Sequence, residues 1–225
     1  MSPRRHTALV AGASGLVGGH LLQLLLADSA YARIVTLARR ELAVHHAKLE
    51  QRVVDFGTLD AFSDIPRADD VFCCLGTTIK TAGSREAFRR VDYDYVLGLA
   101  RAGRRAPLGA RQFLLVSALG ADPASRIFYS RVKGEVEAAV RQLPYEGIQI
   151  FRPSLLLGER AEVRLGERLA IPVARALAPL CVGPLRRYRP IQAADVARAM
   201  VQIAKEAPRG PNVFEYDGII AAARS

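Results

Sequence analysis

Short apolar runs alternate with longer helical patterns along most of the chain. Six runs have the length and composition of buried strands: Thr7 to Ala11, Ile34 to Ala38, Arg52 to Asp55, Asp70 to Leu75, Gln112 to Ser117 and Ile148 to Phe151. Helical patterns separate them at Gly15 to Ala27, Ser84 to Arg104 and Arg126 to Gln142. This alternation predicts an α/β fold, in which a doubly wound, mostly parallel sheet carries helices on both faces.

The pattern becomes less regular after Pro153. A helical stretch from Glu162 to Leu180 is interrupted by prolines, whereas Ala193 to Lys205 predicts a regular amphipathic helix and Val213 to Tyr216 a last short strand. This tail is too short and too interrupted for an independent domain. We therefore expect one domain over residues 1–225.

A glycine-rich string directly follows the first predicted strand and opens the first predicted helix. It reads Gly12-Ala13-Ser14-Gly15-Leu16-Val17-Gly18. In such a turn Gly12 allows the tight bend, Gly15 lets the backbone approach a pyrophosphate, and Gly18 permits close packing of helix on strand. The helix N-terminus presents free N–H groups to the anion, and Ser14 offers a hydroxyl donor. The string predicts a dinucleotide-binding site.

The choice of dinucleotide depends on the end of the second strand, about 20 residues further on. An acidic residue there binds a ribose 2′-hydroxyl and indicates NAD(H), but this chain has Arg39 and Arg40. Guanidinium groups suit a 2′-phosphate because they form charge-assisted, often bidentate hydrogen bonds. NADP(H) is therefore favoured over NAD(H).

Tyr129 and Lys133 are four residues apart on a predicted helix, so their side chains share one face. Ser117 ends the preceding strand and points to the same crevice, because ligands of open α/β sheets bind at the carboxyl ends of strands. A phenol of pKa about 10 is a poor proton donor and acceptor at neutral pH unless a nearby cation favours its anion. Lys133 supplies that cation, Ser117 orients a carbonyl, and Tyr129 exchanges a proton with the substrate oxygen. These three residues are the predicted catalytic set of an oxidoreductase acting on a small carbonyl or alcohol.

These motifs resemble the short-chain dehydrogenase/reductase superfamily in its atypical and extended branch. Further blocks are similar to the oxidoreductase family named for the HIV Tat-interacting protein, and they include Val53 to Phe56, Phe72 to Thr78, Val91 to Val96, Lys133 to Glu137 and Phe151 to Pro153. The resemblance runs from the first strand to beyond Pro153. It departs from the superfamily at Asp92, where an asparagine is common.

The resemblance implies a Rossmann fold that binds NADPH. It places Asp55 and Phe56 near the adenine, and Leu75, Gly76 and Thr77 along the path to the nicotinamide ribose. It implies that Tyr129 and Lys133 touch that ribose. The segment that begins at Pro153 and Ser154 would reach the carboxamide, and residues from about 153 to 190 would form a small C-terminal lobe on the substrate side.

Two other functions compete with a carbonyl reductase. One is a regulatory binding protein that senses NADP(H), although such a protein has no need of Ser117, Tyr129 and Lys133. The other is a nucleotide-sugar epimerase or dehydratase, which uses the same tyrosine and lysine. The apolar segment Leu169 to Val182 is expected to cap the site or pack in the core. A homodimer contact, a protein partner or a membrane surface is the alternative for that segment.

Composition narrows the remaining classes of function. The net charge is +10, but all except four of the 32 basic residues are arginines and they are spread over the chain. Specific nucleic-acid binding is therefore not expected. No stretch reaches the roughly 18 apolar residues of a membrane span. The apolar segment that ends at Gly12 is too short for a signal peptide, so we expect a cytoplasmic protein.

The three cysteines match no metal-site spacing. Cys73 and Cys74 are adjacent in a predicted strand and should point to opposite faces of the sheet. Together with Cys181 they are expected to be small buried hydrophobic residues rather than a redox or metal centre.

Overall fold

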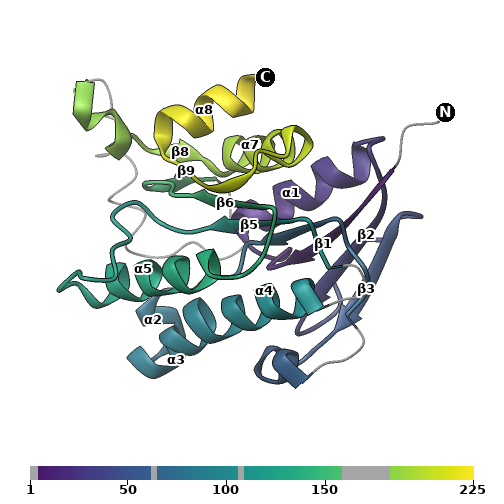
Figure 1. Ribbon diagram of the computed structural model, residues 1–225, viewed down its shortest axis with the longest axis horizontal. Coiled ribbons are helices and arrows are strands. Elements are labelled where there is room, and N and C mark those ends of the chain that lie inside the picture. The colour runs from purple at the N-terminus through teal and green to yellow at the C-terminus, as the bar shows by residue number, and fades with distance from the viewer. Residues whose placement is uncertain (1–4, 62–64, 106–108, 159–182) are drawn as a thin grey trace.

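The computed structural model describes residues 5–61, 65–105, 109–158 and 183–225. These residues form a parallel seven-stranded sheet with the order β3-β2-β1-β4-β5-β6-β9 (Figure 1). Its strands are β1 (His6–Ala11), β2 (Tyr31–Ala38), β3 (Leu49–Val53), β4 (Asp70–Cys73), β5 (Gln112–Val116), β6 (Gly147–Phe151) and β9 (Gly210–Phe214). The first six follow the Rossmann order, so the predicted doubly wound fold is confirmed.

Helices cover both faces of this sheet (Figure 1). One face carries α1 (Leu16–Ala27), α7 (Ala193–Glu206) and α8 (Tyr216–Arg224), and the other carries α4 (Tyr95–Arg105) and α5 (Phe128–Arg141). Two short helices, α2 (Ile79–Ala82) and α3 (Arg85–Arg89), precede α4. Each face has its own apolar core, and Phe72 and Leu9 are among the fully buried side chains of the two cores.

Most predicted elements are present, with shifted ends. The third strand begins at Leu49 rather than Arg52, and none of its residues is buried because it forms the edge of the sheet. The long helix expected from Ser84 is divided into α3, a π-helical turn (Arg90–Asp94) and α4. The last strand starts at Gly210, and α8 follows it although no helix was expected there.

Smaller elements complete the described chain. Short 3-10 helices lie at Phe56–Ala61 and Gly183–Tyr188, and a two-stranded sheet pairs β7 (Leu156–Leu157) with β8 (Ile191–Gln192). Three features expected from the sequence lie outside the described residues: the helix from Glu162 to Leu180, the apolar segment Leu169 to Val182, and Cys181. Most of the expected C-terminal lobe does too.

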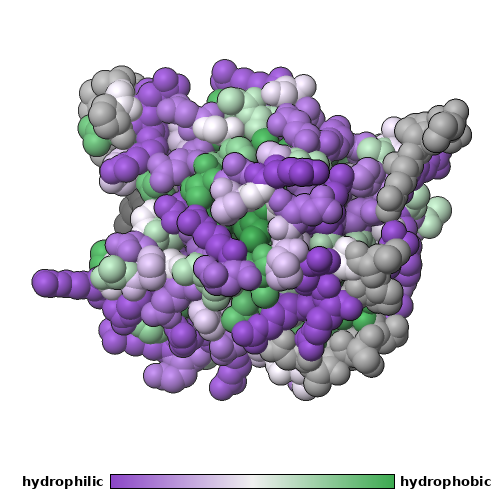
Figure 2. Space-filling view, in the orientation of Figure 1, coloured by the Kyte–Doolittle hydropathy of each residue, from purple (hydrophilic) through white to green (hydrophobic). Residues whose placement is uncertain are grey.

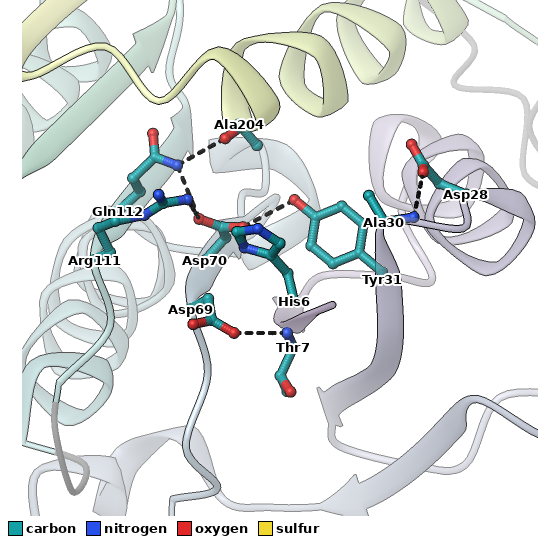
Figure 3. Close-up of polar contacts among 10 residues, drawn as sticks. All are labelled: His6, Thr7, Asp28, Ala30, Tyr31, Asp69, Asp70, Arg111, Gln112 and Ala204. Carbon is teal, nitrogen blue, oxygen red and sulfur yellow. Dashed lines mark hydrogen bonds and ion pairs between the residues drawn. The ribbon is translucent and has the colours of Figure 1, made fainter. Parts of the chain in front are cut away.

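A buried polar network ties together the first residues of four adjacent strands (Figure 3). The carboxylate of Asp70, 1% exposed, accepts hydrogen bonds from the Tyr31 hydroxyl at 2.9 Å and from the Gln112 amide at 2.8 Å. Gln112 also donates to the carbonyl of Ala204 in α7 at 2.9 Å. His6 lies beside the same carboxylate, with Nδ1 3.6 Å from Oδ2. These contacts join the amino ends of β1, β2, β4 and β5 to a covering helix.

The outer surface agrees with the charged composition. Hydrophilic side chains predominate on the face shown in Figure 2, and apolar residues show mainly near the middle of that view. Among the described helices, none is long and apolar enough to cross a membrane.

Candidate active site

A cleft of about 770 Å³ opens at the carboxyl ends of β1, β4 and β5. The residues that line it come mainly from the glycine turn, α1, the segment after β2, the ends of these strands, α2 and α5. They include Ser14, Gly15, Leu16, Val17, Arg40, Leu75, Gly76, Thr77, Ser117, Tyr129 and Lys133. The structure thus brings most of the predicted site residues to one place.

The glycine turn is tight because backbone segments pack directly against it. Gly12 has φ +85°, and a Cβ there would lie 2.5 Å from the carbonyl of Cys74 at the end of β4. A Cβ on Gly18 would lie 2.1 Å from the carbonyl oxygen of Gly12. Both positions therefore require glycine because the main chain approaches closely. The φ of Gly12 suits its predicted tight bend, and Gly18 packs on the turn at Gly12 and Ala13.

The N-terminus of α1 faces the cleft. Gly15 is its N-cap, and within the described chain no side chain caps this end. The first-turn N–H groups of Leu16, Val17 and Gly18 have no partner inside the helix. They form a ready-made site for an anion such as a pyrophosphate. Ser14, which is exposed, stands next to them.

The two arginines after β2 are placed differently. Arg40 lines the cleft, whereas Arg39 does not. Both side chains are exposed, and neither forms an ion pair or hydrogen bond with another described residue. Arg40 is therefore the guanidinium available to a ligand in the cleft.

Tyr129 and Lys133 share the face of α5 that borders the cleft. Lys133 is buried, and its Nζ lies 2.8 Å from Oδ1 of Asp92. Burial works to lower the pKa of Lys133, but the charges of Asp92 and Tyr129 outweigh it, so the pKa is raised. The ring centroids of Tyr129 and of Phe88 in α3 lie 5.4 Å apart. This packing restricts the orientation of the phenol.

Ser117 reaches the cleft but is bound to a residue behind it. Its hydroxyl donates a hydrogen bond of 2.6 Å to Oε1 of Glu137, which is 2% exposed. Arg152 holds the same carboxylate through Nε at 3.0 Å and through a second guanidinium nitrogen. To orient a substrate carbonyl, the Ser117 hydroxyl must turn away from Glu137, so that role stays a prediction.

The residues implied only by the resemblance are less uniformly placed. Asp55 and Phe56 do not line the cleft: Asp55 accepts the Gly57 N–H at 2.8 Å, and Phe56 is buried and stacked on Tyr95. Pro153 is buried. Ser154 donates to the carbonyl of Arg189 and lines a separate cavity of about 480 Å³. None of these four residues lines the cleft.

Sequence reasoning missed several residues of the cleft. His20 and Gln23 lie one and two turns after Leu16 on the same side of α1, a spacing that could have identified them. Thr78 caps α2 by accepting the Thr81 N–H at 3.1 Å, and both threonines line the cleft. A threonine such as Thr78 is typical of a helix N-terminus, so it indicates the start of α2, but it does not indicate a binding site.

Cys73 ends β4 and Cys74 directly follows it, and the two side chains face opposite sides of the sheet, as predicted. Cys73 is buried in the core under α4 and α5, whereas Cys74 packs against the core under α1 and α7. Burial raises the pKa of the Cys73 thiol to about 12, and it also raises the pKa of Cys74. In the described part of the chain, no cluster of three or more His, Cys, Asp or Glu side chains could hold a metal.

Similar solved structures agree with this architecture. The human epimerase family protein SDR39U1 (isoform 2), crystallised with NADPH, matches 93% of this chain and 74% of its own, with a TM-score of 0.64 and 18% identity. A putative epimerase from Burkholderia cenocepacia J2315 matches 100% of this chain and 82% of its own, with a TM-score of 0.68 and 20% identity. At these identities the matches show the fold.

Fungal relatives correct the expected location. The expectation of a cytoplasmic protein is wrong, because relatives from several fungi are named mitochondrial proteins. The expectation rested on the short apolar segment that ends at Gly12, a feature that bears only on hydrophobic secretory signals. A mitochondrial address is amphipathic and arginine-rich, and the length of an apolar run does not test for it.

Sequence relatives place the chain in a family. Protein HTATIP2 of Rattus norvegicus is 42% identical over 171 residues, which are 73% of this chain and 68% of the rat protein. Protein FMP52, mitochondrial, of Coccidioides immitis (strain RS) is 32% identical over 217 residues, covering 91% of this chain and 87% of its own. The resemblance to the family named for the HIV Tat-interacting protein is thereby confirmed. Because the sequence profile of the NAD dependent epimerase/dehydratase family matches residues 8–215, the chain belongs to that family.

Proposed function

We propose that the chain binds NADP(H) in the cleft and transfers hydride between it and a small carbonyl compound or the corresponding alcohol. One observation carries this proposal. The glycine turn, Arg40, Tyr129 and Lys133 line the same cleft, although they come from distant parts of the sequence. A binding site for a pyrophosphate thus lies beside a proton donor and a cation.

The residues fit such a dinucleotide. The volume of about 770 Å³ lies within the roughly 300 to 1,000 Å³ of small-molecule and cofactor sites. The open first turn of α1 suits the pyrophosphate, and the exposed guanidinium of Arg40 suits a 2′-phosphate. The human SDR39U1 structure with NADPH shows that a similar fold accommodates this cofactor.

The chemistry divides between cofactor and protein. The bound nicotinamide supplies or accepts the hydride. Tyr129 gives a proton to the substrate oxygen during reduction and takes it back during oxidation. The buried ammonium of Lys133 favours the phenolate that forms when Tyr129 gives up its proton.

Cofactor choice is tested first by titrating the protein with NADPH and with NADH at physiological salt. Arg40→Ala should weaken NADPH binding by about 10-fold to 100-fold, the loss of one or two charge-assisted hydrogen bonds, and leave NADH binding unchanged. Arg39→Ala is the matched control and should have the smaller effect, because Arg39 lies outside the cleft. Tighter NADH binding, or an Arg40 variant with unchanged NADPH affinity, would contradict the NADP(H) assignment.

Turnover separates an enzyme from an NADP(H)-sensing regulatory protein. Tyr129→Phe should retain NADPH affinity and lose reduction of carbonyl compounds, because it removes the proton that the substrate oxygen needs. A wild-type protein that binds NADPH but reduces nothing in a broad carbonyl panel would favour the sensor.

Nucleotide-sugar epimerisation is a second candidate, and the family membership is the observation that favours it. One structure similar in fold is MoeE5 in complex with UDP-glucose and NAD. Incubation with UDP-hexoses and analysis of the sugar products tests it directly. If the sugar is epimerised or dehydrated without net consumption of NADPH, this function would replace carbonyl reduction as the proposal.

A further inference from the structure

Asp92 is a fully buried carboxylate at the cleft that the proposed chemistry has not used. It lies in the π-helical turn Arg90–Asp94 between α3 and α4, and the cleft reaches it. Turns of this kind are rare and are frequent at functional sites. The turn directs one acidic side chain inward, whereas the neighbouring Asp94 stays exposed.

Two groups hold the carboxylate in place. The backbone N–H of Thr77 donates to Oδ2 at 2.9 Å, and the Lys133 ammonium lies 2.8 Å from Oδ1. Gly76 packs directly against the pair, because a Cβ at that position would lie 3.4 Å from Oδ1 and 3.6 Å from Nζ.

Among the described residues, three titratable groups act against burial to raise the pKa of Lys133. Asp92 faces it from the π-helical turn, the Cys73 thiol from β4 and the Tyr129 phenol from its own helix. The Lys133 side chain is 5% exposed, so water solvates its charge poorly. Asp92 is therefore the group that keeps this buried ammonium protonated, and it also compensates part of the positive field that acts on Tyr129.

We propose that Asp92 is a positioning residue, which acts through Lys133 by fixing the ammonium beside Tyr129 and by setting the pH range over which it stays charged. Its importance for turnover rests on the proposed function. Its electrostatic part does not, because the ion pair exists in the protein without cofactor or substrate.

The chain is well suited to a direct test, since it has only four lysines. Protein labelled with ¹³C-lysine is titrated by NMR without added cofactor, and the Lys133 signal is identified by its absence in Lys133→Met. In the wild-type protein the midpoint of this titration should lie above 10.5, the ordinary pKa of lysine. In Asp92→Asn its midpoint should fall about 1 to 3 pH units lower.

Asp94→Asn is the matched control, because it makes the same chemical change in the same turn on an exposed side chain. It should leave the Lys133 titration as in the wild type. Equal titrations in the wild type and Asp92→Asn would overturn the proposal, whether or not the protein proves to be a reductase.

Asp92→Glu serves as the second variant if Asp92→Asn does not fold. It retains the anion, so the Lys133 midpoint should stay above the ordinary 10.5. A midpoint below pH 10 would contradict the proposal. Where carbonyl reduction is measurable, the alkaline limb of the rate profile should move to lower pH in Asp92→Asn and stay in place in Asp94→Asn. An alkaline limb that does not move in Asp92→Asn would overturn the link to turnover alone.

Discussion

The hydroxyl of Ser117 donates a hydrogen bond of 2.6 Å to the buried carboxylate of Glu137. Glu137 follows Lys133 by one helical turn on α5, so one helix presents Tyr129 and Lys133 to the cleft and Glu137 to the strand end behind it. Arg152, after β6, closes the arrangement by pairing with Glu137. The strand-end serine is therefore held by a buried ion pair.

Glu137→Gln should destabilise the protein by about 2 to 4 kcal/mol, because it leaves the Arg152 guanidinium without its buried counter-charge. Urea unfolding of the protein without ligands gives this free energy. The control is Glu135→Gln on the same helix, whose partner Arg89 is 41% exposed. That change should cost less than about 1 kcal/mol. Equal costs for the two variants would mean that the Glu137–Arg152 pair contributes no more than a surface contact.

Neighbouring glycines in α1 should respond oppositely to alanine. Gly18→Ala places a Cβ 2.1 Å from the Gly12 carbonyl oxygen, and relieving that overlap should cost about 1 to 3 kcal/mol or more. In Gly19→Ala the nearest atom is the Ala13 carbonyl oxygen at 3.7 Å, an ordinary contact. Because Gly19 is within a helix, its replacement should stabilise the protein by about 0.5 to 1 kcal/mol. Thermal unfolding of both variants without cofactor measures the contrast. A Gly18→Ala protein as stable as the wild type would contradict the close packing of α1 on the glycine turn.

The fold could be predicted because its signals are local. Runs such as Val71 to Cys73 are fully buried, and a fully buried parallel strand is apolar at every position. β3 was misplaced for the opposite reason: the edge strand Leu49–Val53 buries no side chain, so its composition is mixed. α8 was missed because only Ile219 and Ala222 are buried in it, too few to give a helical pattern.

The parts of the site that could be predicted are those encoded by one short sequence motif. The glycine turn and the Tyr129–Lys133 pair are such motifs, and the structure places both at one cleft. Asp92 differs, because its partners Thr77 and Lys133 are reached only through a π-helical turn and the packing of that turn on α5. The Ser117–Glu137 contact also depends on how α5 lies against β5. Both relationships join residues that are distant in the sequence, so no local sequence pattern predicts them.

The polar network at the amino ends of the strands should make stability depend on pH through His6 (Figure 3). The polar contact with Asp70 raises the pKa of His6, and Asp69 adds to this effect while burial and Arg111 oppose it. Because the pKa of the folded state lies above the ordinary 6.5, the stabilisation is fully present below that value. It is lost as the pH rises through the raised pKa. The contribution is below about 1 kcal/mol, since the imidazole is 30% exposed and partly screened.

The difference in unfolding free energy between the wild type and His6→Gln, measured by urea denaturation from pH 5.5 to 9, isolates this contribution. The difference should be larger at pH 6 than at pH 8.5, because only the imidazolium is attracted to the Asp70 carboxylate. His45→Gln is the control, since His45 is exposed and has no contact with the network. The change with pH should be larger for His6→Gln than for this control. A constant difference for His6→Gln would show that the imidazole only fills space beside Tyr31, whose ring centroid is 5.9 Å away.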